Sequence, residues 1–572
     1  MTTPEYVSDV IVARLARLGI QHIALNPGAS FRGIHDSLVN FPGAPEMIEV
    51  PHEKIAVGMA HGYAKATGKT MGVMVHDLVG LLHASLGVYY AYVDRAPMLI
   101  VGGAGPMDQA RRRPWIDWIH TANSQNETLR SFTKWDDHPF SAEAIPDSLD
   151  RAFTIARSMP QGPTYVSIDS ELQELALDVG MSDPPMPSEP SRIAPDPAAI
   201  ADLVDRLAAA ERPMLVAGYV GRDPDMWEPL QRLAELSGSG VVDTNLRLSF
   251  PTRHRLNATG TGLIGSADLV VLLDVKDVGA QTGLLGKNDP GLPPRLAPGA
   301  QLVDVGFGDL EISSWASHHG QFYRPDLSVL ADTSLAIPQI IAGLERRKEA
   351  DVVRSDWCER IEATAAAMRA EWQQAGRKSS PTITYARLVA AVGEAIVDQD
   401  WVLSAGTANG WASRLWDFEK PDRHPGRSLG TAAQIGISLG VALAHRDDPD
   451  KLVVALQPDG DLMFDASALW VASHHRLPML MVMVNNRAYG NDVTHQQTMA
   501  KLRNRPMDRA GVGVSLTDPD PDYATLARSF GWIAHGPIEN PDDLTAALTA
   551  AVRSVVVDRR PVLVDVVCEA EL

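Results

Sequence analysis

The chain is poor in cysteine, in long apolar runs and in positive charge, and each shortage excludes a class of protein. Its two cysteines, Cys358 and Cys568, lie far apart in a sequence of 572 residues, so neither a disulfide framework nor a thiolate metal site is expected. No run of about 18 apolar residues is present, so no membrane span is predicted. The formal net charge of −20 disfavours nucleic acids and anionic membranes as partners, because both require a basic surface.

The beginning of the chain also lacks the layout of a signal peptide. An acidic residue comes early and an amphipathic pattern follows, in place of a basic and then an apolar region. We therefore expect a cytoplasmic protein. With 45% hydrophobic and 21% charged residues, the composition is typical of a soluble globular enzyme, and the length predicts two to four domains.

Two linker-like stretches divide the chain. Residues 182–197 contain repeated prolines, and residues 346–374 predict a charged helix that ends shortly before Pro381. The predicted domains are therefore residues 1–182, 195–345 and 380–572.

The first and third domains resemble each other. Residues 8–30 and residues 385–410 each predict a helix, a strand and a glycine-containing loop, and both domains end on an apolar strand. Continuous apolar strands that alternate with helices predict parallel sheets covered on both faces. We expect three doubly wound α/β domains, with a Rossmann-like central one. The glycine loop at residues 218–221 is interpreted as a packing turn and not as a nucleotide cradle.

The most informative stretch is residues 458–486. Asp459 follows the apolar run Leu452–Leu456, and two asparagines ending at Asn486 follow a second apolar run. The residues between predict a helix, so a carboxylate and an amide stand at the carboxyl ends of two strands, where open parallel sheets bind ligands. Asp459, Asn486 and the Ala488 carbonyl offer the oxygen donors that Mg²⁺ prefers, and we expect such an ion to hold a diphosphate. The alternative is a buried unit with a polar turn and no ligand.

This spacing resembles the cofactor motif of thiamine-diphosphate enzymes, in which an acidic triplet and two asparagines are about 25 residues apart. Pro458 replaces the first glycine of the triplet, whereas the carboxylate and Gly460 remain. The order of the three parts is similar to that of the acetolactate synthase and benzoylformate decarboxylase type over nearly the whole chain. The resemblance implies a pyrimidine-binding domain, a central domain and a diphosphate-binding domain, with thiamine diphosphate and Mg²⁺ as cofactors.

The resemblance also implies roles for single residues. Glu53, at the start of a predicted helix, stands in the place of the catalytic glutamate that hydrogen-bonds the aminopyrimidine ring; the alternative is a first-turn acid favoured by the helix dipole. Ile435 matches the aliphatic residue that supports the bent cofactor, unless it is an ordinary core residue. Further cofactor contacts are expected from Asn26, Gly28, Thr407, Ala408, Gly460, Asp461, Leu462 and Tyr489.

Two histidines favour the benzoylformate decarboxylase branch. His76 matches the histidine that ends a strand in that branch, and His120 lies where related enzymes line the pocket, so both are predicted to be catalytic. The alternative for His76 is a strand-end histidine bonded to backbone. The second histidine of the branch, from the central domain, has no counterpart here, and Lys276 or Gln281 would have to substitute.

The favoured reaction is decarboxylation of a 2-keto acid in a homo-oligomer, a dimer or a tetramer, in which Glu53 meets the metal half of a neighbouring subunit. The same cofactor also permits cleavage or formation of 2-hydroxy ketones, as well as an acetolactate synthase-like reaction. An FAD-dependent 2-keto acid oxidase is a further alternative, but FAD is not expected because the segment between Pro251 and Asp268 is short. Asp492 or His495, in the loop after the asparagines, would either flank the substrate or cap the next helix.

Overall fold

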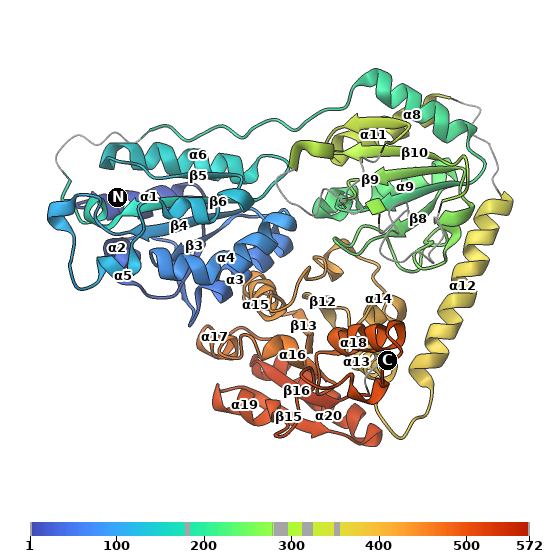
Figure 1. Ribbon diagram of the computed structural model, residues 1–572. Coiled ribbons are helices and arrows are strands. Elements are labelled where there is room, and N and C mark those ends of the chain that lie inside the picture. Colours follow the sequence, from blue (N-terminus) through green and yellow to red (C-terminus); the bar gives the residue numbers. More distant parts are fainter. Residues whose placement is uncertain are drawn as a thin grey trace.

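The computed structural model describes residues 3–177, 184–276, 278–279, 296–311, 324–347 and 355–569. It contains three parallel sheets, each drawn from one of the three predicted parts of the chain, with helices packed on their faces (Figure 1). The predicted fold class, three doubly wound α/β domains, is therefore confirmed. Across the described ranges, no helix combines the length and apolar character that crossing a membrane requires.

The first sheet has six strands in the order β2-β1-β3-β4-β6-β5, all paired in parallel. Its central strands are buried at every position because helices cover both faces, which explains their continuous apolar sequences. The strands are β1 His22–Leu25, β2 Glu46–Glu49, β3 Met71–Val75, β4 Met98–Ala104, β5 Trp135–Asp137 and β6 Pro163–Asp169. The helices are α1 Val7–Arg17, α2 Arg32–Asn40, α3 Glu53–Thr67, α4 Leu78–Val93, α5 Asp117–His120, α6 Ile145–Arg157 and α7 Ser170–Gln173.

The central sheet has five parallel strands in the order β11-β10-β9-β7-β8. The glycine loop after its first strand is a packing turn, as predicted, because a Cβ at Gly218 or Gly221 would collide with the backbone carbonyl of Asp274 or Leu248. The strands are β7 Pro213–Ala217, β8 Gly240–Asp243, β9 Leu269–Leu273, β10 Gln301–Gly306 and β11 Leu327–Leu330. The helices are α8 Pro197–Ala209, α9 Trp227–Ser237 and α11 Thr333–Arg346.

The third sheet has the order β12-β13-β14-β16-β15, and the long helix α12, Ser355–Arg377, leads to it along the side of the molecule (Figure 1). Pairing of Pro458 with Val484 brings the carboxyl ends of β13 and β14 to the same edge. The strands are β12 Asp400–Leu403, β13 Lys451–Pro458, β14 Leu480–Asn485, β15 Ile533–Ile538 and β16 Val562–Val567. The helices are α13 Tyr385–Ile396, α14 Trp411–Leu415, α15 Gln434–Ala444, α16 Asp459–Leu462, α17 Ala468–His474, α18 Gly490–Leu502, α19 Tyr523–Ser529 and α20 Pro541–Asp558. Two short helices, α16 and α17, thus replace the single helix predicted between Asp459 and Asn486.

The first and third domains meet through helices α3 and α15, which lie side by side (Figure 1). Gly58 and Gly436 face each other, with a Cβ on either lying 3.0 Å from the other Cα. A Cβ at Gly62 or Gly440 would collide with a backbone carbonyl of the opposite helix. Glycine at these positions lets the two helix backbones touch, and one hydrophobic core continues across the junction.

Candidate active site

A cavity of about 620 Å³ lies at the carboxyl edge of the third sheet. It is bounded by the loops that follow β12, β13 and β14, by the segment before α15, and by two residues from elsewhere, Asn245 and Tyr385. The loop after β12 holds Ala408, Asn409 and Gly410 at positive φ, a conformation that is costly for non-glycine residues and concentrates at functional loops. No residue of the described range 3–177 lines this cavity.

The predicted metal ligands come together in this cavity. Asp459 is 1% exposed, and its Oδ2 has no hydrogen-bond partner among the residues described. Burial raises the pKa of its carboxyl to about 6, against the opposing effect of backbone N–H groups that include those of Gly460 and Ala488. A buried carboxylate oxygen without a partner costs free energy unless a ligand compensates it. This orphaned oxygen fits a bound cation.

The side chain of Asn486 is fixed beside it. Its Nδ2 donates to the Tyr385 hydroxyl over 2.8 Å, and its Oδ1 accepts from the Ala488 N–H over 3.0 Å. These bonds leave the second lone pair of Oδ1 available. Together with the carboxylate of Asp459, this gives the oxygen-rich donor set that suits Mg²⁺.

Most of the predicted diphosphate contacts also line the cavity, namely Thr407, Ala408, Gly460, Asp461 and Tyr489. The absence of a Cβ at Gly460 matters, because that atom would lie 2.7 Å from the ring of Tyr489. The Asp461 carboxylate accepts from the N–H groups of Ala432 and Gln434 at the start of α15, which anchors α16 to that helix.

Four predicted cofactor residues do not line the cavity: Asn26 and Gly28 of the first domain, and Ile435 and Leu462 of the third. The Leu462 side chain is fully buried in the hydrophobic core, and the expected approach of its backbone to the phosphates stays a prediction. Ile435 is also fully buried. It lies in the first turn of α15, the helix that packs against α3. Its role as a support for the cofactor stays a prediction.

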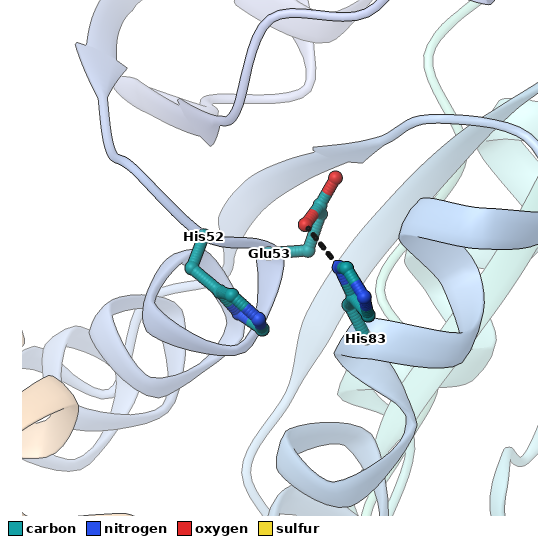
Figure 2. A group of neighbouring side chains, drawn as sticks. All are labelled: His52, Glu53 and His83. Carbon is teal, nitrogen blue, oxygen red and sulfur yellow. Dashed lines mark hydrogen bonds and ion pairs between the residues drawn. The ribbon is translucent and has the colours of Figure 1, made fainter. Parts of the chain in front are cut away.

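The predicted catalytic residues form a separate cluster in the first domain. Glu53 begins α3, with the His52 side chain as N-cap, and is 3% exposed. Its Oε1 accepts from Asn26 Nδ2 over 3.2 Å, and its Oε2 lies 3.4 Å from His83 Nδ1. Figure 2 shows this last contact, with the ring of His52 stacked against His83 at 4.7 Å between centroids.

His76 lies near Glu53, and His120 lies beside His76 together with the Asp77 carboxylate. A Cβ at Gly80 would lie 2.7 Å from Glu53 Oε1 and 2.8 Å from His76 Cβ, so only this glycine separates the two side chains. The rings of His76 and His120 are 5.1 Å apart. Their polar partners differ: His76 Nδ1 lies 2.7 Å from the Ser30 hydroxyl, whereas the buried His120 Nδ1 has no partner within the described ranges.

Gly28 completes this cluster, because a Cβ there would lie 2.9 Å from the His76 ring. The structure therefore unites Asn26, Gly28, Glu53, His76 and His120, which the sequence places in four different segments. Lys276 does not substitute for the missing histidine, because its Nζ donates to the Val93 carbonyl over 2.8 Å at the end of α4. Gln281 lies outside the described residues. Asp492 lines the cavity, and His495 does not.

Several site residues have little signal in the sequence. Asn245 and Tyr385 come from other parts of the chain, and nothing in their local sequence indicates that they reach the cavity. His83 had a weak signal, since it stands in an otherwise apolar helix seven residues after His76. A polar residue on such a face indicates either a buried hydrogen bond or a site.

The fold and these two clusters define a class of protein: an enzyme of parallel α/β domains that binds a diphosphate cofactor on one domain and presents a buried glutamate on another. Comparison with known families agrees. A profile described as "Thiamine pyrophosphate enzyme, N-terminal TPP binding domain" matches residues 6–128, and "Thiamine pyrophosphate enzyme, C-terminal TPP binding domain" matches residues 404–566. The chain belongs to the thiamine pyrophosphate enzyme family, of the acetolactate synthase and benzoylformate decarboxylase type.

Individual relatives span nearly the whole chain. Acetolactate synthase 2 of Nicotiana tabacum is 25% identical and covers 95% of this chain and 80% of its own length. The large subunit of acetolactate synthase isozyme 3 of Escherichia coli is 24% identical, over 98% of this chain and 94% of its own length. The crystal structure of benzoylformate decarboxylase from Polynucleobacter necessarius shares the fold, with a TM-score of 0.77 at 19% identity and coverage of 100% and 99%.

Proposed function

We propose that this protein decarboxylates a 2-keto acid with thiamine diphosphate and Mg²⁺. The observation that carries the proposal is the pairing of His76 with His120, where His76 lies close to the buried carboxylate of Glu53 across Gly80. Decarboxylation needs a proton to be moved at the reacting carbon and at its oxygen, and two imidazoles next to one carboxylate are suited to that task.

The residues of the third domain would hold the cofactor. Asp459, Asn486 and the Ala488 carbonyl would ligate Mg²⁺, and the loops at residues 406–410 and 460–461 would contact the diphosphate through backbone N–H groups. When bound, thiamine diphosphate supplies the nucleophilic carbon and the electron sink for loss of carbon dioxide.

The residues of the first domain would handle protons. Asn26 and His83 hold the two oxygens of Glu53, so this carboxylate is oriented before any ligand arrives. The Ser30 hydroxyl and the Asp77 carboxylate, 2.7 and 2.9 Å from His76 Nδ1, orient this ring, which leaves the opposite ring nitrogen to exchange a proton. His120 Nδ1, which is buried without a partner in the part of the chain described, is available to a substrate oxygen.

We also infer that two chains share each site. The acid cluster and the diphosphate cavity are lined by different domains, so a neighbouring first domain would have to cover the cavity. Helix α4 supports this arrangement, because Leu82, Leu86 and Tyr89 are 53%, 41% and 38% exposed along the face that carries His83. An apolar stripe beside a site is typical of an interface between subunits.

A carboligation that forms a 2-hydroxy-3-keto acid is a second candidate. It is favoured by the acetolactate synthases of Nicotiana tabacum and Escherichia coli, which align with 95% and 98% of this chain. The two reactions share the cofactor and differ in whether a proton or a second carbonyl compound ends the cycle.

One assay separates these candidates. The purified protein with thiamine diphosphate and Mg²⁺ is incubated with pyruvate, with branched 2-keto acids and with benzoylformate, while carbon dioxide, aldehyde and acetolactate are measured. We expect aldehyde and carbon dioxide in equal amounts from one of these acids. Acetolactate without free aldehyde would favour carboligation, and turnover that is unaffected by removal of thiamine diphosphate would refute both. The Glu53→Gln protein is the background control.

A further inference from the structure

A second cavity, of about 460 Å³, lies where the central domain, helix α12 and helix α14 meet. It is lined by residues of the loop after β8, by one face of α12 and by the start of α14. It shares Asn245 and Gly410 with the diphosphate cavity, so the two are neighbours, but its other lining residues are different. Neither the proposed reaction nor the cofactor uses it.

Two guanidinium groups in this cavity form no ion pair within the described ranges. Within the described parts of the chain, no carboxylate pairs with Arg369 or with Arg414, whereas the third arginine, Arg253, is bonded to Asp417 and to the Leu415 carbonyl. Burial lowers the pKa of Arg369, and the nearby charge of Arg253 adds to this effect. The charges of Glu362 and Glu419 oppose this lowering, but no carboxylate of the described residues is bonded to either guanidinium, so both keep donors that an anion can accept from.

The acid that lines the cavity does not neutralise these arginines. Asp243 is buried, and its carboxylate accepts from three backbone N–H groups of its own loop, those of Asn245, Ser249 and Phe250, over 2.8 to 3.0 Å. The Asp243 carboxylate is therefore bonded to its own loop and not to the arginines of the cavity. Burial raises the pKa of Asp243 to about 6, against the opposing effect of these N–H groups.

Part of the remaining wall is apolar, beside the polar side chains of Thr252, Asn257, Thr259 and Ser413. Met368 and Trp372 are four residues apart on α12 and so share a face, with Phe250 also lining the cavity. The Arg414 guanidinium lies 4.9 Å from the Trp411 ring centroid and 5.8 Å from that of Trp372, which holds it in place without using its hydrogen bonds. The cavity thus combines a preorganised cation with an aromatic wall.

We propose that this cavity binds an aromatic organic phosphate of the nucleotide class. Guanidinium groups bind phosphate oxygens in a bidentate manner, so Arg369 and Arg414 would take the phosphate. A planar base would pack against Trp372 and Met368. The volume lies within the range of sites that hold ligands of this size.

The test is calorimetric titration of the full-length protein, already saturated with thiamine diphosphate and Mg²⁺, with ADP. Adenosine and inorganic phosphate, which represent the base-containing part and the phosphate part of ADP, are titrated separately. We expect one ADP per chain, with both halves binding more weakly, and Arg369→Gln or Arg414→Gln weakening ADP binding at least about tenfold. Arg360→Gln, on the same helix but outside the cavity, is the matched control and should bind ADP as the parent protein does. Thermal unfolding of each variant verifies that it is folded.

Three results would overturn the proposal. The first is no ADP binding to the parent protein, and the second is equal affinity in the parent and both arginine variants. The third is ADP binding only when thiamine diphosphate is absent, which would put the nucleotide in the diphosphate cavity. Because the readout is binding and not turnover, a failure here is distinct from a failure of the proposed decarboxylation.

Discussion

Single carboxylates carry most of the chemistry in this chain. Glu53 and Asp459 are both almost fully buried, yet neither forms an ion pair with lysine or arginine within the described ranges. Burying an acid without a cationic partner costs free energy, and such residues concentrate at functional sites. The two acids therefore allow separate predictions.

Glu53→Gln should retain cofactor binding and lose most turnover. The amide keeps the size of the side chain and its bond to Asn26, but it cannot take up or release a proton, so turnover should fall at least about 100-fold. Calorimetry measures binding, and release of carbon dioxide measures turnover. Glu49→Gln, four residues earlier on β2, is the control, and unchanged turnover in the Glu53 variant would refute its role.

The pH dependence of cofactor binding should reveal Asp459. Because burial raises its pKa to about 6, the carboxyl of the ligand-free protein is protonated below that pH and cannot ligate Mg²⁺. The affinity for thiamine diphosphate with Mg²⁺ should be nearly constant above pH 6 and fall about tenfold for each unit below it.

Asp459→Ala should abolish the Mg²⁺-dependent binding of thiamine diphosphate at every pH. Asp508→Ala changes an exposed acid outside the cavity and should bind the cofactor as the parent protein does. Titration calorimetry at a series of pH values provides the test. Affinity that is the same at about pH 5 and pH 7 would contradict the assignment of Asp459 as a metal ligand.

Helices and strands determine the positions of these side chains. Helix α4 is an example, because one of its residues packs tightly against both Glu53 and His76. Gly80 lies in its first turn and is the only residue between Glu53 Oε1 and His76 Cβ, with less than 3 Å to each from a Cβ. The helical backbone does not require glycine at this position, because alanine is favoured over glycine in a helix by about 1 kcal/mol. Glycine is needed because the two neighbouring side chains leave no room for a Cβ.

Gly80→Ala should therefore reduce turnover by about tenfold or more while the thermal unfolding temperature changes little. The gain in helix propensity offsets part of the cost of moving two side chains, but the displaced carboxylate no longer has its catalytic position. Gly87→Ala, also on α4, is the control. Its methyl group would contact Val57 and not Glu53 or His76. Equal turnover in the two variants would contradict the positioning argument.

The packing of helices and strands also explains which site residues could be predicted from the sequence and which could not. Asp459 and Asn486 were predictable because alternating strands and helices put the ends of β13 and β14 at one edge. The role predicted for Glu53 came from the family resemblance, because a helix start by itself explains a first-turn acid without any catalytic function. Asn245 was not predictable, since it reaches the cavity from the central domain, and Tyr385 was not, since it reaches the cavity from α13 through packing within the third domain. The inward direction of the Leu462 side chain depends on core contacts.

For the whole molecule, a buried group of charges joins the domains. The Asp94 carboxylate contacts His61, Lys65, Arg247 and Tyr219 over 2.7 to 3.2 Å, and it links the first domain to the central one. Burial alone would raise the pKa of Asp94, but the charges of Arg247 and Lys65 hold it well below its usual range.

Asp94→Asn should cost about 3 to 5 kcal/mol of stability, because it leaves two buried cations without their counter-charge. The half-life of thermal inactivation measures this loss, since a chain of this size need not unfold reversibly. Glu345→Gln removes an exposed partner of Arg232, at 3.2 Å, and should cost less than about 1 kcal/mol. Similar half-lives for both variants would show that the buried network does not stabilise the assembled domains.

The assembly itself can be tested by mixing two inactive proteins. If each site takes Glu53 from one chain and Asp459 from another, a mixed dimer of the Glu53→Gln and Asp459→Ala chains contains one site with both defects and one with none. Refolding or coexpressing the two in equal amounts should restore about one quarter of the parent turnover, because about half of the dimers are mixed and half of their sites are intact. Each variant alone, carried through the same procedure, is the control. If both acids instead belong to the same chain, every site keeps one defect and the mixture stays inactive, so the absence of any recovery despite verified mixed dimers would refute a shared site.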